Sequence, residues 1–194
     1  MTTHYKPAPR DRTITHFRRT GHAHTGSIGV RSTHAGLADS MRAIPFLVNK
    51  PTAIDAISIE VTSAGAASQV LLALYTNNNG FPDALVPGTT SAELDTSTTG
   101  LKRTTFTAVK LQPQTLYWLV IYFNSSATPP TIRGSTGGFW FEVIVGIADN
   151  TAPGSAAFHS WVVTRTYDAT MPATFPATSS VSSGSGPLIL VEVV

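Results

Sequence analysis

The stretch Leu-Tyr-Trp-Leu-Val-Ile-Tyr-Phe, residues 116–123, is the most apolar part of this 194-residue chain. Aromatic and β-branched side chains favour extended strands, and a run that is apolar at every position indicates a strand buried on both faces. We therefore predict that residues 116–123 form the central strand of a sheet. No run of about 18 apolar residues occurs, so the sequence predicts no membrane span.

Strand patterns surround this central stretch on both sides. Residues 69–76 are apolar on both faces, whereas Ile57, Ile59 and Val61 alternate with polar residues, as in a half-buried strand. The predicted strands are residues 44–48, 53–62, 69–76, 101–111, 116–123, 139–147, 158–167 and 187–194. No segment shows sustained helical spacing with caps. The sequence therefore predicts an all-β fold, an antiparallel β-sandwich of the jelly-roll type.

The composition agrees with a strand-rich fold and excludes several kinds of site. Apolar residues make up 42% of the chain, and charged residues make up 12%, about half the usual share of about a quarter. Thr, Ser, Gly, Pro and Val are abundant, as is typical of strands and turns. Because the chain has no Cys, a disulfide framework, a thiolate metal site and a Cys nucleophile are all excluded.

Two local signals refine the strand prediction. Pro45 favours an edge position, because proline cannot donate a hydrogen bond to a neighbouring strand. The segment Asn77-Asn78-Asn79-Gly80 ends the strand 69–76. Calcium sites draw most of their affinity from carboxylates, and these side chains are neutral amides. We therefore predict a tight β-turn in which Asn or Gly adopts a positive φ.

The first 42 residues differ from the remainder in charge and in apolar content. They contain seven basic and two acidic side chains, a net charge of +5, whereas residues 43–194 have a net charge of −3. Their apolar residues are few and isolated, so this segment buries too little surface to offset its ordering entropy alone. We therefore divide the chain into a basic extended N-terminal arm, residues 1–42, and a β-sandwich domain, residues 43–194.

We expect the arm to become ordered on another protein surface, with a solvated tail as the alternative. The residues expected to make the assembly contacts are Arg10, Arg12, Phe17, Arg18, Arg19 and Arg31. Arginines with an interspersed aromatic side chain also suit phosphate and base contacts. The charge is modest and is diluted by Gly, Thr and His, so nucleic acid is not the expected partner. The segment also lacks the apolar core of a secretory signal.

Catalytic patterns are missing from the sequence. There is no Gly-x-Ser-x-Gly elbow and no phosphate-binding loop. A glycosidase needs two positioned carboxylates, whereas the acids of residues 43–194 lie mostly in or beside predicted turns. His159 lies in a predicted strand beside Trp161, where a core or sheet-surface role is expected. We therefore expect no catalytic residues, no cofactor and no enzymatic activity.

Strand and turn signals follow one another in a recognisable order along residues 43–194. They are residues 43–48 (AIPFLV), 57–62 (ISIEVT), 74–86 (LYTNNNGFPDALV), 99–102 (TGLK), 111–119 (LQPQTLYWL), 171–176 (MPATFP) and 187–190 (PLIL). This pattern resembles a small domain common in virion proteins of tailed bacteriophages. Gln114 and Thr115 stand where that domain has a Gly before its Tyr-Trp pair, so this turn is expected to differ.

The resemblance implies a non-enzymatic structural or adhesin role on a virion that assembles in the host cytoplasm. The expected function is a tail-associated fibre or receptor-binding appendage, docked through the arm. The alternatives are a capsid decoration or cement protein, and a free carbohydrate-binding module or glycan hydrolase. The expected partners are other virion structural proteins, further copies of the chain in a trimer, and a cell-surface glycan.

His22-Ala23-His24 places two imidazoles on one side of an extended segment. Metal sites usually need three or four ligands, so this pair binds a metal only where several chains meet. Three copies around an axis supply six nitrogens, and the segment resembles the His-x-His pairs that hold a metal on the axis of trimeric phage fibres and spikes. Two arm residues without a metal are the alternative.

Overall fold

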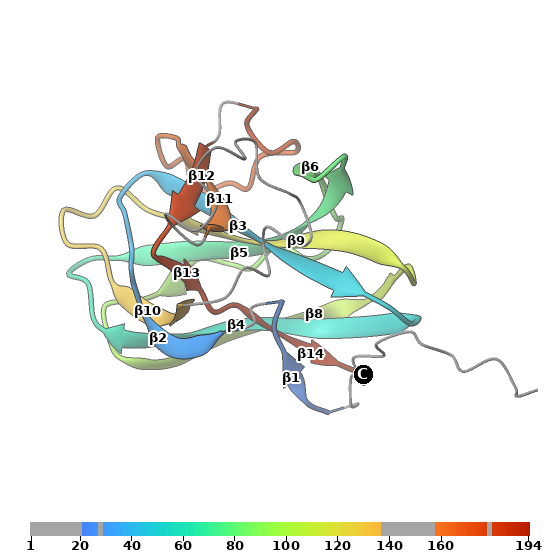
Figure 1. The fold of residues 1–194 in the computed structure, drawn as a ribbon. Helices are drawn as coiled ribbons and strands as arrows, with labels where there is room; N and C mark the ends of the chain where they lie inside the picture. The colour runs from blue at the N-terminus through green and yellow to red at the C-terminus, as the bar shows by residue number, and fades with distance from the viewer. Residues whose placement is uncertain (1–20, 27–28, 137–157, 178–179) are drawn as a thin grey trace, which may run out of the picture.

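The computed structural model describes residues 21–26, 29–136, 158–177 and 180–194. Within them, fourteen strands form two antiparallel sheets of seven strands each (Figure 1). The all-β antiparallel sandwich predicted from the sequence is confirmed. In the described part of the chain, no helix is long and apolar enough to cross a membrane.

Each sheet draws its strands from the whole length of the chain. Sheet A contains β1 (Ala23–His24), β2 (Val30–Ala35), β4 (Thr52–Ser63), β8 (Gly100–Leu111), β10 (Thr131–Thr136), β13 (Ser185–Pro187) and β14 (Leu190–Val193). Sheet B contains β3 (Ser40–Val48), β5 (Gln69–Asn78), β6 (Phe81–Leu85), β7 (Leu94–Asp95), β9 (Thr115–Phe123), β11 (Phe158–Thr164) and β12 (Ser180–Ser183). The strands β3, β4, β5, β8, β9, β10, β11 and β14 alternate between the sheets, so successive main strands build opposite layers.

The central strand of sheet B is β9, as its apolar sequence predicts. It pairs with β3 from Ser40↔Phe123 to Val48↔Thr115, and with β5 on its other side. Both of its faces are buried, because Trp118, on one face, and Ile121, on the other, have no exposed surface. A strand in this position must be apolar throughout, which is the pattern that residues 116–123 show.

In sheet A, alternation separates a buried face from a polar one. Ile57, Ile59 and Val61 on β4 are at most 1% exposed, as the alternating pattern predicts. The C-terminal strand behaves in the same way, with Val191 and Val193 buried. It pairs with β4, so the chain ends inside the sheet.

The backbone confirms the predicted turn and corrects the predicted position of Pro45. The turn between β5 and β6 has Asn79 at φ 52° and Gly80 at φ 85°, which is the pair of positive φ angles that a tight hairpin needs. Pro45 lies on β3 beyond Ala43, the last β3 residue that pairs with β11. Beyond this point the chain at Gly26 lies against the Pro45 carbonyl. β3 as a whole lies between β11 and β9, so the predicted edge position is not that of an outer strand.

The sandwich begins earlier than the predicted boundary at residue 42. β2 pairs with β10 along its whole length, and β3 starts at Ser40. His34 is 3% exposed and Met41 is fully buried. An outer strand is held mainly by backbone hydrogen bonds, so it needs few apolar side chains. The low apolar content of this segment therefore did not indicate a free arm. The division at residue 42 is therefore corrected: β1 and residues 29–42 belong to the sandwich.

Two other predictions concern residues that the structure does not describe. Residues 1–20 of the predicted arm lie outside the described residues, and so does the predicted strand 139–147. The remaining predicted strands correspond to β3, β4, β5, β8, β9, β11 and the β13–β14 segment. The strands β1, β2, β6, β7, β10 and β12 were not predicted.

The corrected boundary predicts opposite outcomes for two truncations. Removing residues 1–20 should leave cooperative thermal unfolding within a few degrees of the full chain, because every described strand remains. Removing residues 1–42 deletes β1, β2 and the fully buried Met41, and should abolish the cooperative transition. Circular dichroism melting of both variants checks this. A cooperative, full-chain-like transition in the longer truncation would restore the boundary at residue 42.

Candidate functional site

The predicted arm residues have different outcomes. Five of them lie outside the described residues: Arg10, Arg12, Phe17, Arg18 and Arg19. Arg31 is exposed on β2, where its Cα partner is Ser135 of β10. Arg31 is therefore part of a sheet and not of a free arm. A role in assembly contacts stays a prediction for all six residues.

The predicted histidine pair lies where the N-terminal segment joins sheet A. His24 belongs to β1 and pairs with Val191 of β14. The Gly21 amide donates to the Val193 carbonyl at 2.7 Å, and the Val193 amide donates to the His22 carbonyl at 3.3 Å. Among the described residues of a single chain, no group of three or more His, Cys, Asp or Glu side chains could hold a metal ion. A site shared between chains stays a prediction.

A segment that is not a strand covers part of the outer face of sheet B, and we call residues 165–175 the strap. The Tyr75 hydroxyl donates to the Pro172 carbonyl at 2.6 Å. The Tyr75 and Phe175 rings meet edge to face at 5.8 Å. Met171 and Phe175 are buried, so the strap contributes to the apolar core.

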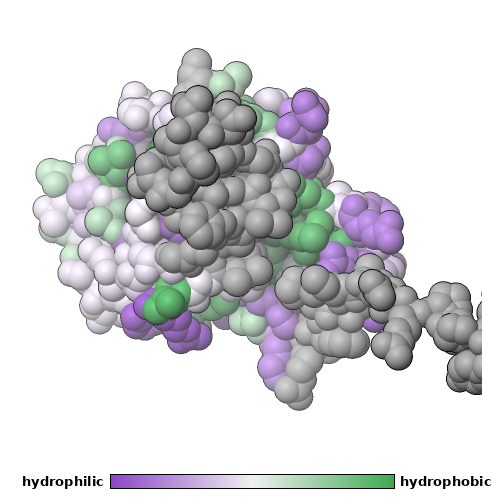
Figure 2. Space-filling view, viewed as in Figure 1, coloured by the Kyte–Doolittle hydropathy of each residue, from purple (hydrophilic) through white to green (hydrophobic). Residues whose placement is uncertain are grey.

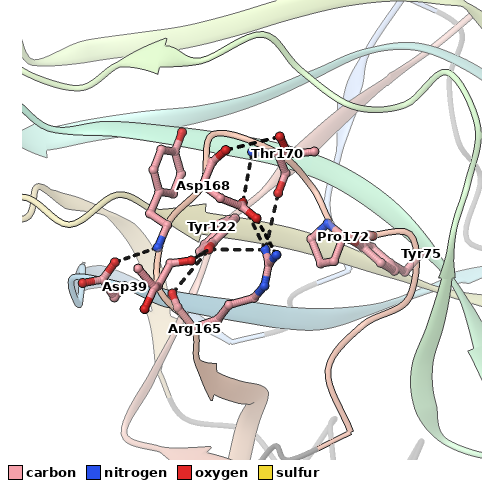
Figure 3. A network of polar contacts seen from close by, with 9 residues as sticks. Asp39, Tyr75, Tyr122, Arg165, Asp168, Thr170 and Pro172 are labelled. Atoms are coloured by element: carbon pink, nitrogen blue, oxygen red, sulfur yellow. Dashed lines mark hydrogen bonds and ion pairs between the residues drawn. The ribbon is translucent and has the colours of Figure 1, made fainter.

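A polar network joins the start of the strap to β9 (Figure 3). The Tyr122 hydroxyl donates to the Thr166 carbonyl at 2.5 Å. Arg165 lies over the Tyr122 ring, 5.5 Å from its centre, and forms an ion pair with Asp168 at 2.6 Å. Burial of Tyr122 raises the pKa of its hydroxyl, so this group remains a hydrogen-bond donor at neutral pH.

Asp39 and Tyr167 extend this network at the surface. The Asp39 carboxylate accepts from the Tyr167 amide at 2.8 Å, and the Asp39 carbonyl accepts from the Arg165 amide at 2.7 Å. The Tyr167 hydroxyl donates to Glu93 at 2.8 Å. These carboxylates and hydroxyls are engaged in fixing the strap, so the network is a structural clamp that gives this face a defined shape.

A second polar group lies between the sheets, and we call it the basic cluster: His34, Arg42, His159 and Ser160, with Ser182 and Ser185 beside them. These residues lie on β2, β3, β11, β12 and β13, and β13 contacts each of the other four strands. The His34 Nδ1 lies 3.1 Å from the Ser185 Oγ, and Arg42 Nη1 donates to the Ser182 Oγ at 2.7 Å. His34, His159 and Ser160 are at most 3% exposed.

The pKa of His34 is strongly lowered, to about 4 from an ordinary value of 6.5. Burial is the largest cause, and the positive charge of Arg42 and the nearby His159 act in the same direction. His34 is therefore neutral at pH 7. No sequence signal indicated this cluster, because its members come from distant parts of the chain and meet only through strand pairing.

The large hydrophobic residues that are exposed in the described part of the chain come from different elements of the fold. The exposed large hydrophobic residues are Val30, Leu37, Leu47, Leu101, Val181 and Val194. On the face seen in Figure 2, the described hydrophobic residues are exposed in separate small areas among polar ones. Scattered exposed apolar residues are normal for a folded protein and do not by themselves indicate a binding site.

The clamp predicts unequal effects for two tyrosine substitutions. Tyr122→Phe removes the hydroxyl that satisfies a strap carbonyl, and should lower the free energy of unfolding by about 1–3 kcal/mol. Tyr167→Phe removes a bond to an exposed carboxylate and should lower it by less than about 1 kcal/mol. Urea denaturation of both variants checks this order. Equal effects would contradict the clamp.

The lowered pKa of His34 predicts that the stability of the fold depends on pH. Between pH 4 and 6.5 the unfolded chain binds a proton at this residue and the folded chain does not, so the free energy of unfolding rises with pH across this window. The full contribution is about 3 kcal/mol. His34→Gln should remove that part of the dependence, as measured by urea denaturation at pH 4 and pH 7. An unchanged difference between the two pH values would contradict the assignment.

Comparisons with known proteins add little to this description. No protein-family model matches the chain, and no curated protein matches it. Among solved structures it is similar to the cysteine protease and lectin-like domains of Cwp84, a surface layer associated protein of Clostridium difficile. The identity is 13% and the TM-score is 0.40, and the match covers 84% of this chain and 36% of that chain. The chain thus spans little more than a third of that neighbour, and a likeness this weak supports no functional conclusion.

Proposed function

We propose that this protein is a non-enzymatic structural component of the exterior of a tailed-phage virion. Its role is that of a tail-associated fibre or receptor-binding appendage, docked through N-terminal residues. The resemblance of its strand and turn order to phage virion domains supports the proposal. The sandwich also needs no disulfide for its core, which suits a protein that folds in a reducing cytoplasm.

The attachment of the N-terminal segment is the observation that carries the proposal. Residues 1–20 contain five basic side chains and one acidic side chain. The chain then enters sheet A directly, because the Gly21 amide bonds to the Val193 carbonyl and β1 pairs with β14. A basic leader tied to a sheet in this way transmits the position of its binding partner to the sandwich. An acidic surface on another virion protein is the partner that suits its charge.

The first test reverses two positive charges in the leader, residues 1–20. A control variant reverses two positive charges in the sandwich. Arg18→Glu with Arg19→Glu should lower the number of copies per purified particle at least tenfold. The control carries Lys50→Glu and Lys110→Glu, two exposed residues of the sandwich, and should incorporate at the wild-type level. Quantitative mass spectrometry of particles measures both. Equal incorporation of the two variants would contradict docking through the leader.

Copy number distinguishes the tail from the capsid. A tail component should be present in tens of copies per particle, whereas a capsid decoration protein should be present in hundreds. The same mass spectrometry of wild-type particles gives this number. Hundreds of copies would replace the tail role by the decoration role, and absence from particles would contradict both.

A further inference from the structure

Arg42 brings a positive charge between the sheets, and no acidic side chain of the described residues forms an ion pair with it. It lies on β3, where its Cα partner on β11 is Val162. Arg42 is partly buried, and this burial lowers the pKa of its guanidinium. The ion pairs among the described residues are Arg103–Glu192, Arg133–Glu60 and Arg165–Asp168, and Arg42 is in none of them. An unpaired charge in such a place is costly, so the site favours an anion.

The path of the Arg42 side chain places its charge beside Ser160. Val162 and Ser160 lie two residues apart on β11 and share a face. Ser182, on β12, is the Cα partner of Ser160. Because Arg42 reaches Ser182 from the other side of β11, its guanidinium must pass over this strand. The serine hydroxyl and the guanidinium therefore face the same space between the sheets.

Two further polar atoms of the basic cluster have no hydrogen-bond partner in the described part of the chain. The Ser160 Oγ and the His34 Nε2 are buried and have no hydrogen-bond partner among the described residues. Buried polar atoms are nearly always paired, so each exception needs an explanation. If Nδ1 of His34 accepts from the Ser185 hydroxyl, its Nε2 carries the proton and donates. Arg42 lies close enough to His34 for its charge to lower the pKa of the imidazole, so a guanidinium and an imidazole N–H lie near one another in this cluster.

We propose that the basic cluster binds a small oxyanion, a sulfate, phosphate or carboxylate group, between Arg42, Ser160 and His34. The planar guanidinium matches the paired oxygens of such a group, and the serine and histidine supply further donors. An ordered water would satisfy the hydrogen bonds of Ser160 and His34, but it would leave the charge of Arg42 uncompensated. The proposal does not depend on the virion role.

The test titrates the full chain with salts and follows its unfolding temperature. Sodium sulfate, sodium phosphate and sodium acetate are each compared with sodium chloride at equal ionic strength. Sulfate and phosphate also stabilise proteins without binding, and that effect does not saturate. The expected result is a saturable rise on top of this background. Saturation with acetate alone identifies a carboxylate ligand, and saturation with sulfate or phosphate identifies a tetrahedral one.

Three variants test whether the saturable rise in unfolding temperature comes from the basic cluster. Arg42→Lys keeps the positive charge but loses the planar guanidinium that can donate two parallel hydrogen bonds. It should weaken binding of the oxyanion at least tenfold. Ser160→Ala removes an unpaired hydroxyl, so it should leave the salt-free stability unchanged or higher while weakening binding several-fold. Arg133→Lys, at a surface ion pair, should bind as the wild type does.

Two results would overturn the proposal. One is a wild-type response that does not saturate with any of the three salts. The other is saturable binding that neither Arg42→Lys nor Ser160→Ala weakens. If Arg42→Lys does not fold, Ser160→Ala alone decides, because removal of its small unpaired hydroxyl leaves the core intact.

Discussion

The pairing of β9 with β3 and β5 is the interaction on which the remaining structure depends. It creates a sheet whose middle is apolar on both faces, so sheet A can cover only one of them. The other face presents Tyr75, Trp118 and Tyr122, which have no exposed surface. Apolar surface of this size must be covered by something, since its exposure is unfavourable at about 25 cal/mol per Å². The strap and its clamp are the described part of that cover.

The sequence predicts those strands whose apolar residues show that one or both faces are buried. Residues 69–76 and 116–123 are apolar enough to show burial on two faces, and Ile57, Ile59 and Val61 show burial on one. β2 and β10 were missed because they contain few apolar residues: in β10 the buried apolar side chain is Ile132. Such strands form because their neighbours offer free backbone groups, and no local pattern records this.

The basic cluster could not be predicted for a related reason. Arg42 lay at the predicted boundary between arm and sandwich, and His34 lay inside the predicted arm. Their closeness to His159 depends on two pairings, that of β2 with β10 in sheet A and that of β11 with β3 in sheet B. Both join residues about 100 or more positions apart in the sequence. The prediction for His159, a core or sheet-surface role, agrees with its 1% exposure, but its neighbours follow only from the fold.

The outer strands of the two sheets are protected from pairing with other molecules in different ways. On one side of β5 lie the short strands β6 and β7. Between them the hydroxyls of Thr89 and Ser91 accept from the amides of Leu74 and Leu72, so a stretch that is not a strand satisfies the part of β5 that neither strand pairs with. On β8, Lys102 pairs with the buried Ile59, which places a charge on the core side of an outer strand. Both devices discourage sheet-to-sheet association. In the virion role proposed above, the protein would be present in many copies at high local density, and an open edge would then join copies without regard to their proper partners. On that proposal, assembly contacts would be left to segments outside the sheet edges, and the charge of residues 1–20 favours the basic leader.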